Sequence, residues 1–208
     1  MEVKKDLKSK DYIVKTAFIL FLQKGYKEVT IKNIMEATNL SKGAIYHHFK
    51  SKEEIYFSTL DIYYLNLLQT DYKYFQSGNF VEDIRLLYNY VSDMFANIEN
   101  LTKEGLEYPI RNFYNFQLES EKNEIIRSKI SPAIEQSREI IRKIVLTASE
   151  SGQIKKDLDI ESVTFQIIAL IEGIAIHHSM IRNNVKKELM NKYHLIFDSY
   201  LKLICADE

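Results

Sequence analysis

The chain has 208 residues, of which 46% are hydrophobic and 27% charged, and its net charge at pH 7 is −1. This apolar content excludes an intrinsically disordered protein, and the length leaves room for a small module plus a larger domain with its own core. The charged N-terminus lacks the apolar segment of a secretory signal, and no run of 18 uncharged apolar residues occurs. We therefore expect a cytoplasmic protein that does not enter a membrane.

The charge is unevenly distributed along the chain. Residues 1–55 contain 11 Lys and 7 Asp or Glu, a net charge of +4, whereas the remaining residues carry −5. This asymmetry indicates that the N-terminal segment binds nucleic acid. The alternative is that these lysines only solvate a small domain, which would give the same charge balance.

The pattern of apolar residues is helical throughout. Only 2 Pro and 6 Gly interrupt the chain, which favours an all-α fold. The first predicted helix extends from about Lys8 to Lys24, and Gly25 ends it. One face of this helix is apolar and contains Ile13, Ala17, Leu20 and Phe21.

Two short amphipathic helices around a tight turn follow. Thr30 is expected to cap the first helix, and Asn39 tolerates the left-handed backbone that a sharp turn needs. Ser41 is expected to cap the second helix, which turns Ile45 and Phe49 toward the core. The opposite, exposed face then carries Lys42, Gly43, Tyr46 and His47. This arrangement predicts a helix-turn-helix for double-stranded DNA.

The segments AFILFLQKGYKEVTIKNIMEA and SKGAIYHHFKSKEEIY resemble the tetracycline-repressor (TetR) family of bacterial transcriptional regulators. The resemblance extends from about Ile13 to Tyr56. It implies an N-terminal three-helix DNA-binding domain, here residues 1–55, and an all-helical C-terminal domain, residues 56–208, that senses a ligand. It also implies a homodimer that represses transcription. One departure is Asn39, where the family's turn usually has Gly, but Asn is the next best residue for this backbone conformation.

Eight residues are assigned to DNA contacts from this resemblance and from their outward geometry. The expected phosphate contacts are Thr30, Ser41, Tyr46 and Lys52, and the expected major-groove surface consists of Lys42, Gly43, Ala44 and His47.

A long helix is predicted after the helix-turn-helix, from Ser51 as its N-cap to about Phe75. This helix would join the two domains and transmit a shift from one to the other. The next helix has apolar residues at spacings of three and four: Ile84, Tyr88, Val91, Phe95 and Ile98.

The middle of the C-terminal domain is marked by Pro and Gly. A short, broken helix is expected from Glu104 to Glu119. A further helix is expected to begin with Ser131 as cap and Pro132 in its first turn, and to end near Gly152. Whether residues 121–130 join this helix through a kink stays open.

The helix that Asp159 is expected to cap continues to about Arg182 and is apolar nearly all round. Such a helix must be covered on more than one side, and we expect a second copy of the chain to supply one cover. The resemblance implies the same homodimer, with a four-helix bundle built from this helix and the last one, about Val185 to Ile204, of each subunit. The alternative is that both helices fill a core within one chain.

The resemblance also implies a small molecule bound inside the C-terminal bundle. The expected wall is Tyr88, Phe95, Phe113, Tyr114, Phe116, Gln117, Ile134 and Ile171, a set that suits a largely apolar ligand. Ordinary core packing is the alternative for each aromatic residue. Glu172 and His177 are added because ionisable groups in an apolar helix need a partner or a ligand.

No motif of an enzyme or a metal centre was found. The sequence has no paired Glu-x-x-His motif, no glycine-rich phosphate loop and no serine-nucleophile elbow. The sequence is therefore interpreted as a ligand-responsive transcriptional regulator without a cofactor, a repressor that a small, largely apolar molecule releases from its DNA operator. The alternative is a dimeric DNA-associated protein whose C-terminal domain binds a protein partner.

Overall fold

The computed structural model describes residues 2–101, 107–120 and 122–206, and its regular secondary structure is helical, as predicted. The described residues form two compact units. Unit 1 comprises the chain up to Leu68 together with Asn112–Ile130, and unit 2 comprises Gln69–Arg111 together with the chain from Ser131 onward. Unit 1 thus extends beyond the domain of residues 1–55 that was expected from the sequence.

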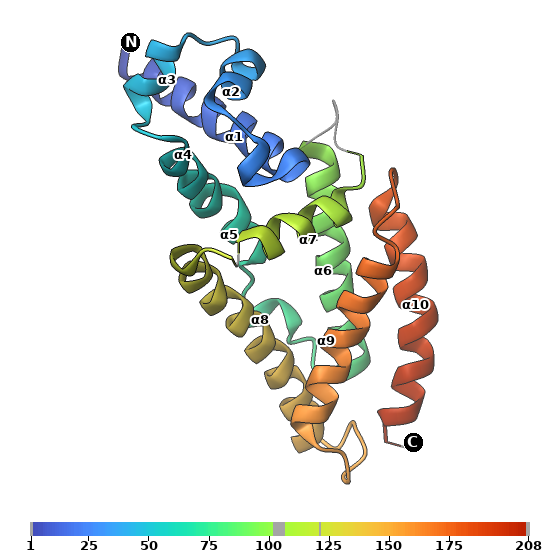
Figure 1. Ribbon diagram of the computed structural model, residues 1–208. Helices are drawn as coiled ribbons and strands as arrows, with labels where there is room; N and C mark the ends of the chain where they lie inside the picture. Colours follow the sequence, from blue (N-terminus) through green and yellow to red (C-terminus); the bar gives the residue numbers. More distant parts are fainter. Residues whose placement is uncertain (1, 102–106, 121, 207–208) are drawn as a thin grey trace. The chain divides into compact units, whose positions relative to one another are not determined.

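The chain of unit 1 begins with a long helix, followed by short helices of which the first and third pack against it (Figure 1). In chain order they are α1 (Glu2–Glu28), α2 (Ile31–Thr38), α3 (Lys42–His48), α4 (Lys52–Thr59), the π-helix η1 (Leu60–Tyr64) and α5 (Leu65–Leu68). α1 starts before the predicted Lys8. Its helical geometry is interrupted at Gly25, where φ is 78°, a left-handed value that Gly adopts without strain. The predicted break at Gly25 is therefore present, although α1 continues to Glu28 beyond it.

The core of unit 1 forms where these helices turn their apolar faces inward. Its fully buried residues include Ile13, Ala17, Phe21, Ile34, Ile45 and Ile55, whereas Leu20 is only half-buried. Parts of α7 (Pro109–Ser120) and α8 (Glu124–Glu150) complete the same core. The ring of Phe116 in α7 lies 5.7 Å from that of Phe18 and 5.6 Å from that of Tyr56.

The predicted long helix of residues 51–75 is interrupted in the structure. α4 passes into η1, and α5 ends at Leu68. The side chain of Asp71 then accepts a backbone N–H at 3.0 Å and starts the short 3₁₀-helix η2 (Tyr72–Phe75). Asp side chains compete for backbone donors in this way, which apolar spacing does not reveal. The prediction of one continuous helix was therefore wrong.

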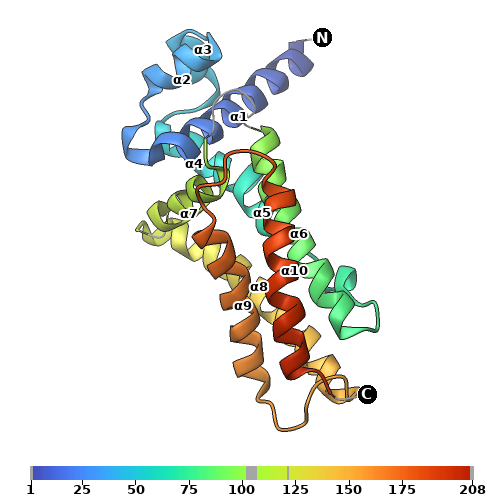
Figure 2. The same cartoon turned by 90° about the vertical axis from the view of Figure 1, so that its right-hand side faces the viewer.

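Unit 2 is a helical bundle in which α10 (Val185–Ile204) packs against both α6 (Phe80–Leu101) and α9 (Ile160–His177). Figures 1 and 2 show these three helices side by side. The buried stripe of α6 contains Ile84, Tyr88, Phe95 and Ile98, as predicted, and Val91 is half-buried. Glu99 of α6 accepts backbone N–H groups at the start of α10 at 2.9 and 3.1 Å, which fixes that end of α10.

α8 starts earlier than the predicted cap at Ser131. It begins at Glu124, because the side-chain oxygen of Asn123 accepts backbone N–H groups two and three residues ahead, at 3.0 and 3.3 Å. Pro132 lies inside α8 instead of in its first turn. The assignment of Ser131 as N-cap was therefore wrong. The alternative, that residues before Ser131 belong to the same helix, is correct from Glu124 onward. Glu121 lies outside the described residues.

The remaining helix ends are close to their predicted positions. Asp159 caps α9 as predicted, accepting the backbone N–H of Ser162 at 2.8 Å. α9 ends at His177, earlier than predicted, whereas α10 has the predicted bounds. The predicted start of α7 at Glu104 lies outside the described residues, and the helix there begins at Pro109.

α9 is long and apolar enough to cross a membrane by length and composition, with a mean hydropathy of 1.4 over its 18 residues. A single helix of this kind is weak evidence for a membrane span, because core helices of soluble proteins have the same composition. Val163, Ile167, Ile171 and Ala175 of α9 are buried inside unit 2. We therefore interpret α9 as part of the bundle.

Candidate functional site

The first helix of the helix-turn-helix is fixed by a reciprocal cap. The hydroxyl of Thr30 accepts the backbone N–H of Asn33 at 3.2 Å, and the side chain of Asn33 accepts the backbone N–H of Thr30 at 2.9 Å. The sequence analysis identified the cap but not its partner, since Glu or Gln is the usual residue at this position. Thr30 is exposed, so its side chain stands at the surface beside the start of α2.

The turn between α2 and α3 has the predicted left-handed residue. Asn39 has φ 55° and ψ 33° and ends α2. The buried hydroxyl of Thr38 donates to the carbonyl of Ile34 at 2.7 Å, which holds the last turn of α2. Ser41 then accepts the backbone N–H of Ala44 at 3.2 Å and starts α3. The reversal that sets the angle between the two helices therefore depends on local hydrogen bonds.

The structure separates the two faces of α3 as predicted. Ile45 and the adjoining Phe49 are 0% and 1% exposed, whereas Tyr46 is 44% exposed. The other exposed residues of this face are Ser41, Lys42, Gly43 and His47, and Ala44 is half-buried. We call the exposed residues of α3 together with Ser41 the α3 face. Its ammonium, imidazole and hydroxyl groups suit phosphates and base edges.

Gly43 has no structural reason to be glycine within unit 1. It lies inside a helix, where Gly costs about 0.5–1 kcal/mol relative to Ala. A Cβ built at Gly43 would meet only the hydroxyl of Ser41, 3.9 Å away. The open space above Gly43 allows another molecule to approach the backbone of α3 closely.

Lys52 is engaged inside unit 1, which differs from its expected role as a free phosphate ligand. Its ammonium donates to the carbonyls of Tyr26 and Val29 at 2.7 and 2.8 Å and lies 4.1 Å from the centre of the Tyr26 ring. Desolvation lowers the pKa of Lys52. Two of its three N–H donors thus stabilise the end of α1 and the residue that follows it, and one remains for another partner.

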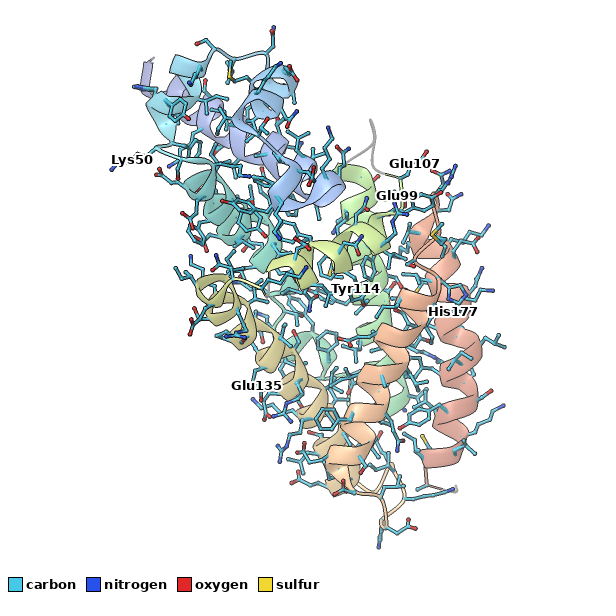
Figure 3. All side chains as sticks on the ribbon, viewed as in Figure 1. Lys50, Glu99, Glu107, Tyr114, Glu135 and His177 are labelled. Carbon is cyan, nitrogen blue, oxygen red and sulfur yellow. The ribbon has the colours of Figure 1, made fainter. Side chains whose placement is uncertain are left out.

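The sequence analysis missed Lys50 as a candidate DNA contact. Lys50 is exposed in the loop between α3 and α4 and projects outward in Figure 3. Its backbone N–H donates to the carboxylate of Glu54 at 2.6 Å, which fixes the loop while leaving the ammonium at the surface. The sequence did indicate this exposure, because Lys50 lies between the apolar Phe49 and the N-cap Ser51. A residue in such a loop neither packs in the core nor forms part of a helix.

The ten predicted effector residues are divided between the two units. Phe113, Tyr114, Phe116 and Gln117 belong to unit 1, and Tyr88, Phe95, Ile134, Ile171, Glu172 and His177 belong to unit 2. The set is therefore described separately in each unit.

The predicted aromatic residues pack against other rings. In unit 1 the ring of Phe113 stacks on that of Tyr64 at 5.4 Å, and Phe116 is 2% exposed. In unit 2 the ring of Tyr88 stacks on those of Tyr193 and Phe197 at 5.5 and 5.3 Å. Phe95 is fully buried, and Tyr114 and Gln117 are half-buried. These contacts are those of an ordinary core.

The remaining predicted effector residues lie on or near α8 and α9. Ile171 is buried, and its carbonyl accepts the hydroxyl of Tyr193 at 2.9 Å. Ile134, Glu172 and His177 are exposed, and Figure 3 shows His177 at the end of α9. Desolvation raises the pKa of Glu172 even though its side chain reaches the surface.

Unit 2 also contains cavities that the sequence analysis did not foresee. One, of about 290 Å³, is lined by residues of η2, the start of α6 and the end of α8, including Tyr72, Phe80 and Asp83. An adjoining groove of about 680 Å³ also includes Tyr72 in its wall. Neither is lined by any of the ten predicted effector residues. The available sequence signal was the group of aromatic residues between Asp71 and Asp83, namely Tyr72, Tyr74, Phe75 and Phe80.

Two family models match the chain. "Bacterial regulatory proteins, tetR family" matches residues 13–59, and "Tetracyclin repressor-like, C-terminal domain" matches residues 113–190, so that more than half of the chain is covered. A similar protein is the "HTH-type transcriptional repressor DhaR" of Mycobacterium sp. (strain GP1), which is 26% identical over 175 residues, 84% of each chain.

Solved structures are similar over nearly the whole chain. A TetR transcriptional regulator from Chloroflexus aurantiacus J-10-FL is 25% identical with a TM-score of 0.71, and the match covers 98% of this chain and 100% of the other. The ketosteroid transcriptional regulator KstR2 of Mycobacterium tuberculosis is 18% identical with a TM-score of 0.72, and the match covers 95% of each chain. At this lower identity the likeness shows the fold alone.

Proposed function

Because this chain belongs to the tetR family of bacterial regulatory proteins and is a DNA-binding transcriptional regulator, we propose that it acts as a homodimeric repressor. In this proposal a small, largely apolar molecule releases the dimer from its operator.

The observation that carries the proposal is the division of α3 into a buried and an exposed face. The buried face anchors α3 in unit 1, so the α3 face is presented on a rigid support. In the proposal Lys42, Gly43, Ala44 and His47 meet base edges in the major groove. Ser41 and Tyr46 donate hydrogen bonds to phosphates, and the ammonium groups of Lys50 and Lys52 attract the same backbone. The hydroxyl of Thr30 donates to the side-chain oxygen of Asn33 at 2.8 Å in the free protein, so in the proposal it exchanges this bond for one to a phosphate.

The proposed dimer uses the exposed apolar side of α9 and α10. Phe165 and Ile176 of α9 are 55% and 51% exposed in the single chain, and Leu195 and Leu203 of α10 are 66% and 69% exposed. Exposed apolar residues on two adjacent helices mark an interaction surface. A two-fold dimer would place two α3 helices roughly 34 Å apart, which matches successive major grooves on one side of DNA.

The proposed release requires only a modest coupling between effector and DNA. A coupling free energy of about 1–3 kcal/mol would weaken operator binding roughly 5- to 150-fold. The effector need only bind the operator-free conformation better than the operator-bound one.

Capture of genomic DNA tests the DNA-binding part of the proposal. Fragments retained by the purified full chain would be sequenced, and their affinity measured for the wild type, for Tyr46→Ala and for Tyr74→Ala. Tyr74 is 63% exposed but lies in unit 2, so it is the matched control. We expect Tyr46→Ala to bind roughly tenfold more weakly, as one lost hydrogen bond to a phosphate implies, with Tyr74→Ala unchanged. Equal affinities would contradict the proposal.

A reporter gene behind the captured operator tests repression. We expect expression to fall when the protein is present and to recover when the effector is added. Release by a protein partner instead of a small molecule would favour the alternative of a dimeric DNA-associated interaction protein.

A further inference from the structure

A partly enclosed cavity of about 290 Å³ lies within unit 2, between η2, the start of α6 and the end of α8. Its wall is largely apolar and includes Phe75, Phe80, Ile144 and Ala148, all of which are buried. Pockets that bind small organic molecules measure about 300–1,000 Å³ and combine an apolar wall with a few placed polar groups. The cavity lies just below this range in volume and has this kind of lining.

The charged group on the wall is the carboxylate of Asp83, which is only 7% exposed. One of its oxygens accepts the backbone N–H of Ser77 at 2.7 Å. Among the described residues that line the cavity there is no Lys, Arg or His. A buried carboxylate without a cation is unfavourable, and its position near the start of α6 compensates the charge only in part. The cavity therefore favours a positively charged occupant.

Cationic side chains of the surrounding segments have other partners, and the ammonium of Lys143 lies 5.8 Å from the centre of the Tyr72 ring. The ammonium of Lys73 lies 2.9 Å from the carboxylate of Asp71, and the guanidinium of Arg85 lies 3.8 Å from that of Asp198. Neither pair includes Asp83. The Asp83 carboxylate is thus left to a cation that enters the cavity.

Three aromatic residues, Tyr72, Phe75 and Phe80, border the same cavity. An aromatic face attracts an organic cation by about 0.5–2 kcal/mol, with the larger values in desolvated sites. A carboxylate combined with aromatic rings suits an ammonium group on an apolar body better than it suits a neutral or anionic molecule.

Hydrogen bonds hold the walls of the cavity in place. The hydroxyls of Tyr72 and Thr147 lie 3.1 Å apart and join η2 to α8. The side-chain oxygen of Gln153 accepts the backbone N–H of Phe80 at 2.7 Å, which fixes the start of α6. A site with fixed walls loses little conformational freedom on binding, so this cavity is suited to a small ligand.

We propose that this cavity binds a small organic ammonium ion, with the ammonium group against the Asp83 carboxylate and the apolar part against the rings of Tyr72, Phe75 and Phe80. The inference names a chemical class for the effector and a place for it, and as an effector site it rests on the proposed function.

Calorimetry with the purified full chain, without DNA, tests the binding. The probes are benzylamine and butylamine, each compared with the alcohol of the same carbon skeleton. We expect the amines to bind and the alcohols to bind at least roughly tenfold more weakly, because only the amines are charged at pH 7. Equal binding of amine and alcohol, or no binding by either amine, would overturn the inference.

Two variants locate the site. Asp83→Asn removes the charge and keeps an oxygen for the Ser77 N–H, and Ala148→Leu fills the cavity and keeps the charge. We expect each to weaken amine binding by roughly tenfold or more. The control is Asp93→Asn on the same helix, where the carboxylate pairs with Lys186 at 2.6 Å outside the cavity. Unchanged amine binding in folded Asp83→Asn, checked by circular dichroism, would contradict the site.

Operator binding separates this inference from the proposed function. Amine binding that depends on Asp83 but leaves operator affinity unchanged would support the site and contradict its role as effector site. Weaker operator binding by the Tyr46→Ala variant, with amine binding absent from the wild type, would support the regulator and overturn the inference.

Discussion

α3 and α9 each bury one face inside their own unit and expose the other, but the exposed faces differ in chemistry. On α3 the exposed residues include Lys42, Tyr46 and His47, whereas on α9 they include Phe165 and Ile176. Polar donors on a capped helix suit phosphates and base edges, and apolar side chains suit another protein surface. The composition of the exposed face, more than the existence of the helix, therefore identifies the kind of partner.

Phe165→Glu tests the apolar side of this comparison, and we expect its effect to be the largest. A charge on the proposed dimer face should give monomers, visible by light scattering. Operator affinity should fall about 10²- to 10⁴-fold, because one DNA-binding unit can no longer assist the other. The control is Tyr74→Glu, at an aromatic residue of η2 that is 63% exposed, against 55% for Phe165. A Phe165→Glu variant that stays dimeric would break the comparison.

Lys52→Ala and Lys50→Ala test whether each lysine beside α3 stabilises the fold or binds DNA. Lys52 donates to two backbone carbonyls, so its loss should lower the free energy of unfolding by about 1–3 kcal/mol in a denaturant titration. Lys50 is exposed, so its loss should leave stability unchanged and reduce the salt dependence of operator binding by about one phosphate contact. Equal free energies of unfolding for the two variants would contradict the structural role of Lys52 and leave phosphate binding as its role.

Gly43→Ala tests the close approach to the polar face. The added methyl meets nothing nearer than 3.9 Å inside the unit, so thermal unfolding should show a gain of about 0.5–1 kcal/mol. Operator affinity should nevertheless decrease, since the methyl occupies space that the proposal gives to DNA. An alanine variant with wild-type affinity would show that DNA does not come close to this part of α3.

Asn39→Gly should have the smallest effect. Asn39 has φ 55°, which Gly adopts without strain, so stability is expected to change by only a few tenths of a kcal/mol. Asn39→Ala is the contrasting variant and should be less stable, because Ala disfavours this conformation. Similar melting temperatures for Gly and Ala would contradict the role assigned to this residue.

The helix-turn-helix could be predicted from the sequence because its geometry is determined locally. Thr30 and Ser41 cap helices that begin one residue later, and the spacing of Ile45 and Phe49 fixes which face of α3 is buried. The residues missed there, Asn33 and Lys50, lie in the same segment. Asn33 could have been identified by allowing Asn as well as Glu or Gln in a reciprocal cap, and Lys50 by including loop lysines among the DNA contacts.

The cavity beside Asp83 could not be predicted in the same way, because a cavity depends on packing between distant segments. The rings of Phe113 and Phe116 have the composition of a ligand wall but fill the core of unit 1. Asp83 and Tyr72 border a cavity only because η2 interrupts the helix predicted to continue through it. The helix breaks here because the Asp71 side chain accepts a backbone N–H, and the spacing of apolar residues does not predict such a hydrogen bond.

The most direct test of the central claim is a structure of the protein bound to its captured operator. We expect α3 in the major groove with Tyr46 and His47 against the duplex, and two α3 helices roughly 34 Å apart. A complex in which α3 faces away from the DNA, or in which a single chain binds without a partner, would contradict it.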